Sequence, residues 1–190
     1  MSSFDPQKWK NKIWDRHIKR ISNPRLTESQ RLSETKWMAE EIELVDGLNE
    51  LISWCNLKRI NVYFTNRKCG GGYIGQEKTI YINSTQSVEK QLFILLHECG
   101  HLLIDNKNET TEFRFQYGYP ASDPHIKRRF VHRCVVVEEE FEAWHRGRKL
   151  ATKLGIKIND ERFSSTKASM LKSYMRWALG DPRFQGGGPE

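Results

Sequence analysis

Two histidines four residues apart, in an otherwise apolar stretch, are the feature that most constrains how this sequence can fold. The segment His97-Glu98-Cys99-Gly100-His101 is an H-E-x-x-H motif, and the apolar residues from Val88 to about Ile104 predict a buried helix around it. The i, i+4 spacing puts both imidazoles on one face of that helix, close enough to share a metal ion. Burying a neutral imidazole costs free energy unless its nitrogens are hydrogen-bonded or bind a metal, and coordination to zinc would remove this cost.

Glu98 lies directly beside the two histidines, and it is predicted to be the general base that acts on a zinc-bound water. A structural zinc would need four protein ligands, whereas a catalytic zinc keeps one position for water. The motif therefore predicts a zinc-dependent metallopeptidase. Its cofactor would be Zn2+, His97 and His101 would be two of its ligands, and its substrate would be a protein or peptide.

The third ligand is expected from a second helix, predicted from about His125 to Leu154. A metzincin would continue the motif with Gly at 104 and His at 107, but the chain has Ile104 and Lys107. Residues 135–144 instead read VVVEEEFEAW and offer four carboxylates: Glu138, Glu139, Glu140 and Glu142. A three-histidine site that uses His125 or His132 is the alternative left open.

Helical phase selects Glu140 among these carboxylates. It is the only charge on the apolar stripe predicted to face the core, which consists of Val136, Glu140, Ala143, Gly147, Leu150 and Leu154. A lone buried carboxylate is costly unless it is ion-paired or metal-bound, whereas Glu139 and Glu142 share a polar stripe with Arg146 and Lys149. The small residues of the apolar stripe also predict a close approach to the motif helix. The rival hypothesis is that Glu139 or Glu142 holds the metal instead.

The remaining patterns predict an α+β fold, mostly helical, with a short twisted sheet just before the motif helix. A long helix is expected from about 28 to 54 after a capping box, and alternating residues predict strands near 60–64 and 80–82. The sheet is expected to be antiparallel or mixed. The glycines at 69–75 lead into more strand and not into a helix, so they favour turns and a hairpin over a dinucleotide site. A last helix is expected over 160–179.

The chain divides into a basic aromatic arm (1–25), a single zincin-like metallopeptidase domain (26–180) and a flexible tail (181–190). The arm is expected to be a short helix whose tryptophans dock on the domain. The loop at 105–124 carries Tyr117 and Tyr119, which with His132 are candidates to stabilise an oxyanion. The four cysteines form no C-x-x-C pair, and neither a run of about 18 apolar residues nor a secretory signal occurs. We therefore expect free thiols in a soluble, cytoplasmic protein without a membrane partner.

The stretch from Gly72 to Leu103, with its H-E-x-x-H motif, resembles the ImmA/IrrE family of metallopeptidases over about residues 60 to 104. The family occurs in bacteria, phages and mobile elements. The resemblance implies a small gluzincin-like fold, in which a long helix, a short twisted sheet and the motif helix precede a second helix that bears a glutamate ligand. By likeness to zincins, the edge of the strand at 80–82 is expected to bind an extended substrate.

The residues after Glu140 depart from the family pattern, which indicates a divergent branch, phage-encoded and active in the host cytoplasm. A competing hypothesis is a regulator that binds nucleic acid or a host protein, with a structural or vestigial zinc site. Its support is the formal charge of +7, from 31 basic and 24 acidic residues, with the basic arm and the run Lys127-Arg128-Arg129. The intact Glu98 counts against it, because a structural site needs no base.

Overall fold

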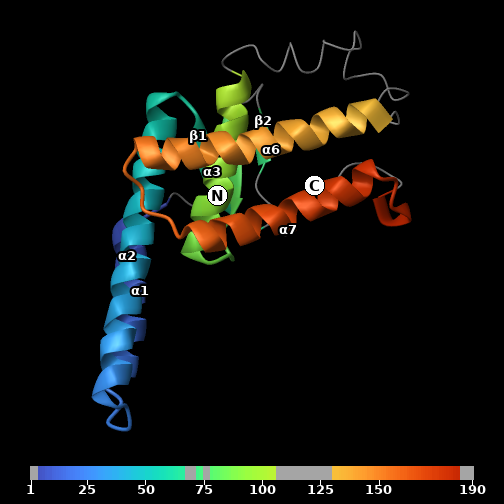
Figure 1. Cartoon of the computed structure of the whole chain (residues 1–190). Coiled ribbons are helices and arrows are strands. Elements are labelled where there is room, and N and C mark those ends of the chain that lie inside the picture. Colours follow the sequence, from blue (N-terminus) through green and yellow to red (C-terminus); the bar gives the residue numbers. More distant parts are fainter. Residues whose placement is uncertain (1–3, 67–71, 75–77, 106–129, 185–190) are drawn as a thin grey trace.

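Figure 1 shows the structure, a computed structural model that describes residues 4–66, 72–74, 78–105 and 130–184. In chain order its elements are α1 (Pro6–Ile21), α2 (Glu28–Leu57), β1 (Asn61–Thr65), β2 (Gly72–Ile74), β3 (Thr79–Asn83), α3 (Val88–Asp105), α6 (Phe130–Lys153), α7 (Asp160–Ala178) and the 3-10 turn η1 (Pro182–Phe184). The predicted α+β class is confirmed, since helices dominate and a small sheet precedes α3. No helix in the described ranges is both long and apolar enough to cross a membrane.

The sheet has three strands in the order β1-β3-β2. β1 runs parallel to β3, with Val62 beside Ile80, and β2 runs antiparallel to β3, with Tyr73 beside Ile80. The sheet is therefore mixed, which is one of the two arrangements expected. The expectation that the strand at 80–82 offers an edge to substrate is wrong, because β3 is the central strand and is paired on both sides. Among the described strands, the outer ones are β1 and β2.

Helix α2 begins where the sequence predicts. Thr27 and Gln30 form a reciprocal capping box, in which the Thr27 side chain accepts from the Gln30 N–H and the Gln30 side chain accepts from the Thr27 N–H. Met38, Val45 and Leu48 are buried, as the periodicity indicates. Leu32, which the helical spacing of apolar residues would place on the same face, is 72% exposed and does not belong to it. It lies six residues before Met38, which is about 240° away around the helix axis.

Helix α1 lies along α2 in Figure 1 and is joined to it by ion pairs. The pairs are Lys10–Asp46, Arg16–Glu41 and Arg20–Glu34, and the buried His17 lies between the carboxylates of Glu34 and Glu41. Of the two tryptophans expected to dock, Trp9 packs against the core, whereas Trp14 is 52% exposed. The acidic side chains of α2 thus neutralise part of the positive charge of the arm. The domain boundaries near residues 25 and 180 stay predictions.

Helix α3 is the most enclosed element and carries the H-E-x-x-H motif. The Ser87 hydroxyl accepts a hydrogen bond of 3.3 Å from the Lys90 N–H and so caps the start of the helix, as serine commonly does. Every residue from 91 to 100 is buried, because α2, α6, α7 and the sheet all contact the helix. A helix surrounded in this way holds its side chains in fixed directions, which suits a site that needs a defined geometry.

Helices α3 and α6 touch through their main chains where they cross (Figure 1). A Cβ atom added at Gly100 would lie 1.9 Å from the Ala143 carbonyl oxygen, and one added at Gly147 would lie 2.4 Å from the Leu96 carbonyl oxygen. No side chain fits at either glycine without moving a backbone. The close approach predicted from the small residues of the apolar stripe is therefore confirmed.

We expect Gly147→Ala to destabilise the protein by about 2 to 3 kcal/mol, because the added methyl collides with a carbonyl that a packed helix holds in place. Alanine's better helix propensity, about 1 kcal/mol, offsets only part of this cost. Denaturant unfolding measures the difference. Gly47→Ala is the matched control, because its added Cβ meets a side-chain methyl of Ile156 and no backbone atom. Equal losses for the two variants would contradict the backbone contact.

Candidate metal centre

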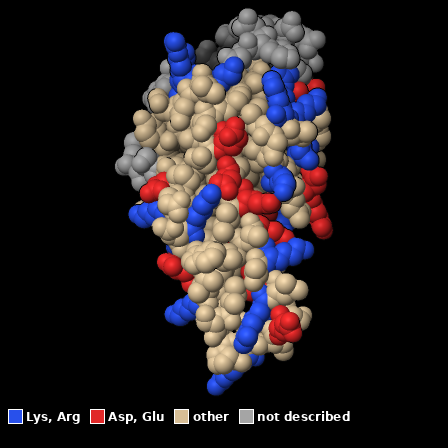
Figure 2. All heavy atoms as spheres, turned by 90° about the vertical axis from the view of Figure 1, so that its left-hand side faces the viewer, with Lys and Arg blue, Asp and Glu red and all other residues tan. Residues whose placement is uncertain are grey.

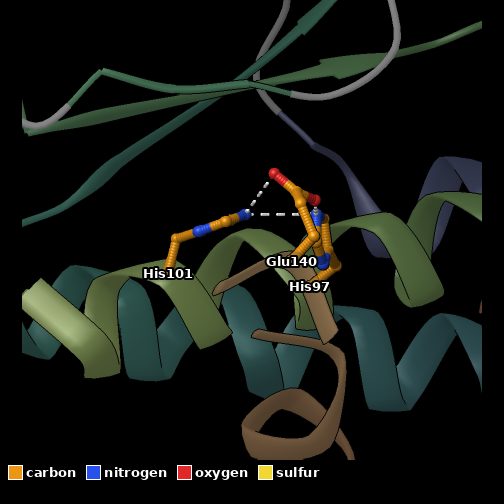
Figure 3. A group of neighbouring side chains, drawn as sticks. All are labelled: His97, His101 and Glu140. Carbon is orange, nitrogen blue, oxygen red and sulfur yellow. Dashed lines mark hydrogen bonds and ion pairs between the residues drawn. The ribbon is translucent and has the colours of Figure 1, made fainter. Parts of the chain in front are cut away.

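Three side chains from two helices converge on one point (Figure 3). His97 and His101 project from α3, and Glu140 projects from α6. The His97 Nε2 lies 3.3 Å from the His101 Nε2 and 3.2 Å from the Glu140 Oε2, and the His101 Nε2 lies 3.5 Å from the Glu140 Oε1. All three side chains are mostly or fully buried. Among the described residues, this is the one group of three or more metal-ligating side chains close enough to hold an ion.

The spacing of these atoms fits a tetrahedral metal. Zinc bonds to nitrogen and oxygen of about 2.0 to 2.1 Å, at tetrahedral angles, put neighbouring ligand atoms about 3.3 Å apart. The two histidine nitrogens are 3.3 Å apart, and they lie 3.2 and 3.5 Å from the two different oxygens of Glu140, all close to this value. With a single oxygen of Glu140 as ligand, the three ligand atoms lie within 4.8 Å of one another. Two imidazole nitrogens and one carboxylate are also the ligand set of a catalytic zinc site, with a fourth position left for water or substrate.

The electrostatics of the cluster are those of a tightly coupled acid–base group. Burial alone would lower the pKa of His101, but hydrogen bonds to Glu139 and Glu140, with the charges of Glu140 and Glu98, raise that pKa to about 10. Burial would raise the pKa of Glu140, but hydrogen bonds to His101 and His97 bring it down to about 2. Without a metal, the carboxylate and imidazolium thus neutralise each other. A metal ion would take over the role of that positive charge.

Aromatic packing fixes the ring of His97. The imidazole stacks on Trp144, with ring centroids 4.6 Å apart and an interplanar angle of 23°. Trp144 in turn meets Phe163 of α7 edge to face, and Phe163 meets Phe93 of α3 in the same way. Among the described residues the His97 Nδ1 has no hydrogen-bond partner, so the stacking and the contacts of the Nε2 atom orient this ring.

The neighbouring glutamates of α6 take different positions. The Glu139 Oε1 lies 3.7 Å from the Nδ1 of His101, the ring nitrogen that faces away from the cluster. Glu142 forms an i, i+4 ion pair of 2.8 Å with Arg146, as the polar stripe predicts, and Arg146 also donates to the Leu103 carbonyl. Glu139 is thus placed to orient His101 from outside the cluster, and Glu142 is engaged elsewhere.

Glu98 is 6% exposed and belongs to the turn of α3 that carries His97. Its charge contributes to the raised pKa of His101. His132 lies on α6, a little over two turns before Glu140, and is not part of the cluster. The other candidates, His125, Tyr117 and Tyr119, lie outside the described residues, as does most of the loop predicted at 105–124.

Tyr174 is a site residue that the sequence analysis did not identify. The sequence predicts only that it lies on the last helix, but in the structure its half-buried side chain reaches the cluster from α7. Burial raises the pKa of Tyr174, and the charge of Glu140 and a hydrogen bond to that carboxylate raise it further. The one signal in the sequence was a hydroxyl among otherwise apolar residues of the helix face. That signal does not say what the hydroxyl meets.

Two histidines and a glutamate thus meet where α3 and α6 cross, beside the small mixed sheet. The family model of the IrrE N-terminal-like domain, peptidase family M78, matches residues 60–128. The chain is therefore ImmA/IrrE-like over this segment, which contains the sheet and all of α3. The match ends before α6, so the position of Glu140 is supported by geometry and not by the family model. No curated protein and no solved structure matches the chain.

Proposed function

We propose that this protein is a zinc-dependent peptidase, in which His97, His101 and Glu140 hold the metal and Glu98 is the general base. The observation that carries the proposal is the convergence of two imidazoles and one carboxylate, whose ligand atoms all lie within 4.8 Å of one another. The match to a peptidase family over the motif supports it. Zinc bound there would supply a Lewis acid that polarises the scissile carbonyl and activates water near neutral pH.

The remaining steps, proton transfer and positioning of the ligands, would fall to side chains of the protein. The Glu98 carboxylate takes a proton from the attacking water and passes it to the leaving amine nitrogen. Glu139, on the outer nitrogen of His101, and Tyr174, hydrogen-bonded to Glu140, hold the ligands in position. Among the described strands β2 is an outer one and contacts α3, and its outer edge is where we expect an extended peptide to add as a further strand.

The competing function, nucleic-acid binding through a basic surface, has weaker support. The arm's cations Lys10, Arg16 and Arg20 are ion-paired with α2. On the face shown in Figure 2, basic and acidic side chains alternate, with no continuous basic patch. A surface that binds the phosphate backbone of a nucleic acid requires clustered positive charge. We therefore retain the peptidase as the proposed function.

Metal analysis tests the proposed site. We expect about one zinc per chain in the purified protein, and loss of that zinc in the double variant His97→Ala with His101→Ala, because two of its three protein ligands would be gone. His145→Ala is the matched control, since His145 is exposed on α6 away from the cluster. Full zinc retention by the double variant would contradict the assignment, and so would equal loss in the control.

A further inference from the structure

Two cysteines face each other on the side of α3 that is turned away from the metal cluster. The Sγ atoms of Cys55, near the end of α2, and Cys99, in α3, are 3.4 Å apart, and both residues are completely buried. Cys99 lies within the H-E-x-x-H motif, but it is two residues from each histidine. A step of two residues turns about 200° around a helix, so Cys99 points at α2 while the histidines point at α6.

We propose that Cys55 and Cys99 are a site of reversible disulfide formation, which links α2 covalently to the metal-binding helix. The oxidant is a hydroperoxide. One thiolate sulfur attacks the peroxide oxygen, which gives a sulfenic acid and releases an alcohol or water. The second thiol then displaces water from the sulfenic acid and forms the S–S bond. Two thiols lose two electrons and two protons, and the peroxide takes them up, so the step balances without another reactant.

The geometry suits this reaction. A disulfide bond is about 2.05 Å long, so the sulfurs must approach by about 1.4 Å from their separation in the structure. The two cysteines come from helices that are already packed together, and 44 positions separate them in the chain. A bond there closes a long loop and restricts the unfolded chain. Because both sulfurs are completely buried, a bulky disulfide reagent is excluded and the oxidant must be as small as a hydroperoxide.

The bond would join α2 to the side of α3 that carries Cys99, and it would not involve the side that carries His97 and His101. It is therefore a property of the fold and does not depend on whether the protein cleaves peptides. The other described cysteine, Cys134, is exposed on α6, and it provides an internal comparison for ordinary surface oxidation.

The test uses the full chain with Cys69→Ser and Cys134→Ser, which leaves Cys55 and Cys99 as the two remaining thiols of the original four. After treatment of the folded protein with hydrogen peroxide, thiols are blocked and the protein is digested without reductant. We expect the free thiol count to fall from two to zero, a cross-linked peptide that contains both cysteines, and recovery of both thiols with dithiothreitol. The midpoint of thermal unfolding should rise by about 5 to 10 °C on oxidation.

The same protein with Cys55→Ala added is the control, and it should show neither the cross-link nor the rise in unfolding temperature. The proposal is overturned if both thiols survive peroxide, or if Cys99 is oxidised only to sulfinic or sulfonic acid. A cross-link that forms only in denaturant also overturns it, since the native fold would then not hold the sulfurs together. Zinc content measured in parallel keeps this outcome separate from failure of the proposed metal site.

Discussion

Glu98→Gln should abolish peptide cleavage, with turnover reduced by about three orders of magnitude, while the protein keeps its zinc and its fold. The side chain is 6% exposed, and the change replaces one oxygen by an amide nitrogen of nearly the same size. The core around α3 is therefore preserved. What is lost is a carboxylate that can accept a proton from water, and an amide cannot replace it.

The measurement begins with a proteome-wide search for new protein termini in cells that express either the wild type or Glu98→Gln. Termini present only with the wild type identify a substrate, on which turnover is then measured with purified proteins of equal zinc content. Glu138→Gln is the matched control, because Glu138 is exposed on α6 and does not belong to the cluster. Unchanged turnover by Glu98→Gln would show that another group is the base.

A second large effect is expected at Glu140, the proposed third ligand of the metal. Glu140→Gln should weaken zinc binding by two orders of magnitude or more, because a neutral amide replaces the only anionic ligand of the cluster. Glu142→Gln should leave zinc affinity unchanged, since that carboxylate pairs with Arg146. Tyr174→Phe and Glu139→Gln should each weaken zinc binding about tenfold, because each removes a group that orients a ligand but does not itself bind the metal. Competition with a chromogenic chelator at fixed pH measures all four.

The order of these losses distinguishes the alternatives. A large loss at Glu139 or Glu142 with none at Glu140 would show that helical phase selects the wrong carboxylate. Equal losses at all three would point to a general effect of charge near the site. Circular dichroism of each metal-free variant is the control for folding, because the apo protein already pairs Glu140 with the two histidines.

The parts of the site that the sequence predicts are those that depend on one helix at a time. The i, i+4 spacing is enough to bring His97 and His101 together on α3, and the apolar stripe is enough to direct Glu140 inward. Ser87 and Thr27 mark helix starts by a local hydrogen-bonding pattern in the same way. The metal ligation itself stays a prediction, although the side chains are close enough for it.

The features that the sequence does not predict depend on how separate elements meet. Tyr174 is part of the site only because α7 packs on α6, and nothing within its own helix specifies that. Strand β3 is central because it pairs with β1 in parallel on one side and with β2 in antiparallel on the other. Leu32 is apolar, but its angle around the helix axis differs from that of the buried residues of α2. Its exposure could therefore have been predicted from that angle.

The contact between Gly100 and Ala143 acts as a pivot for the two ligand-bearing helices. His97 comes three residues before Gly100, and Glu140 comes three residues before Ala143, so each ligand lies within one turn of the point where the main chains touch. A rocking motion of α6 against α3 therefore has a short lever arm at the ligands and a long one at the helix ends. Any such motion would therefore displace the far ends of α6 more than it would change the separations of the three ligand side chains.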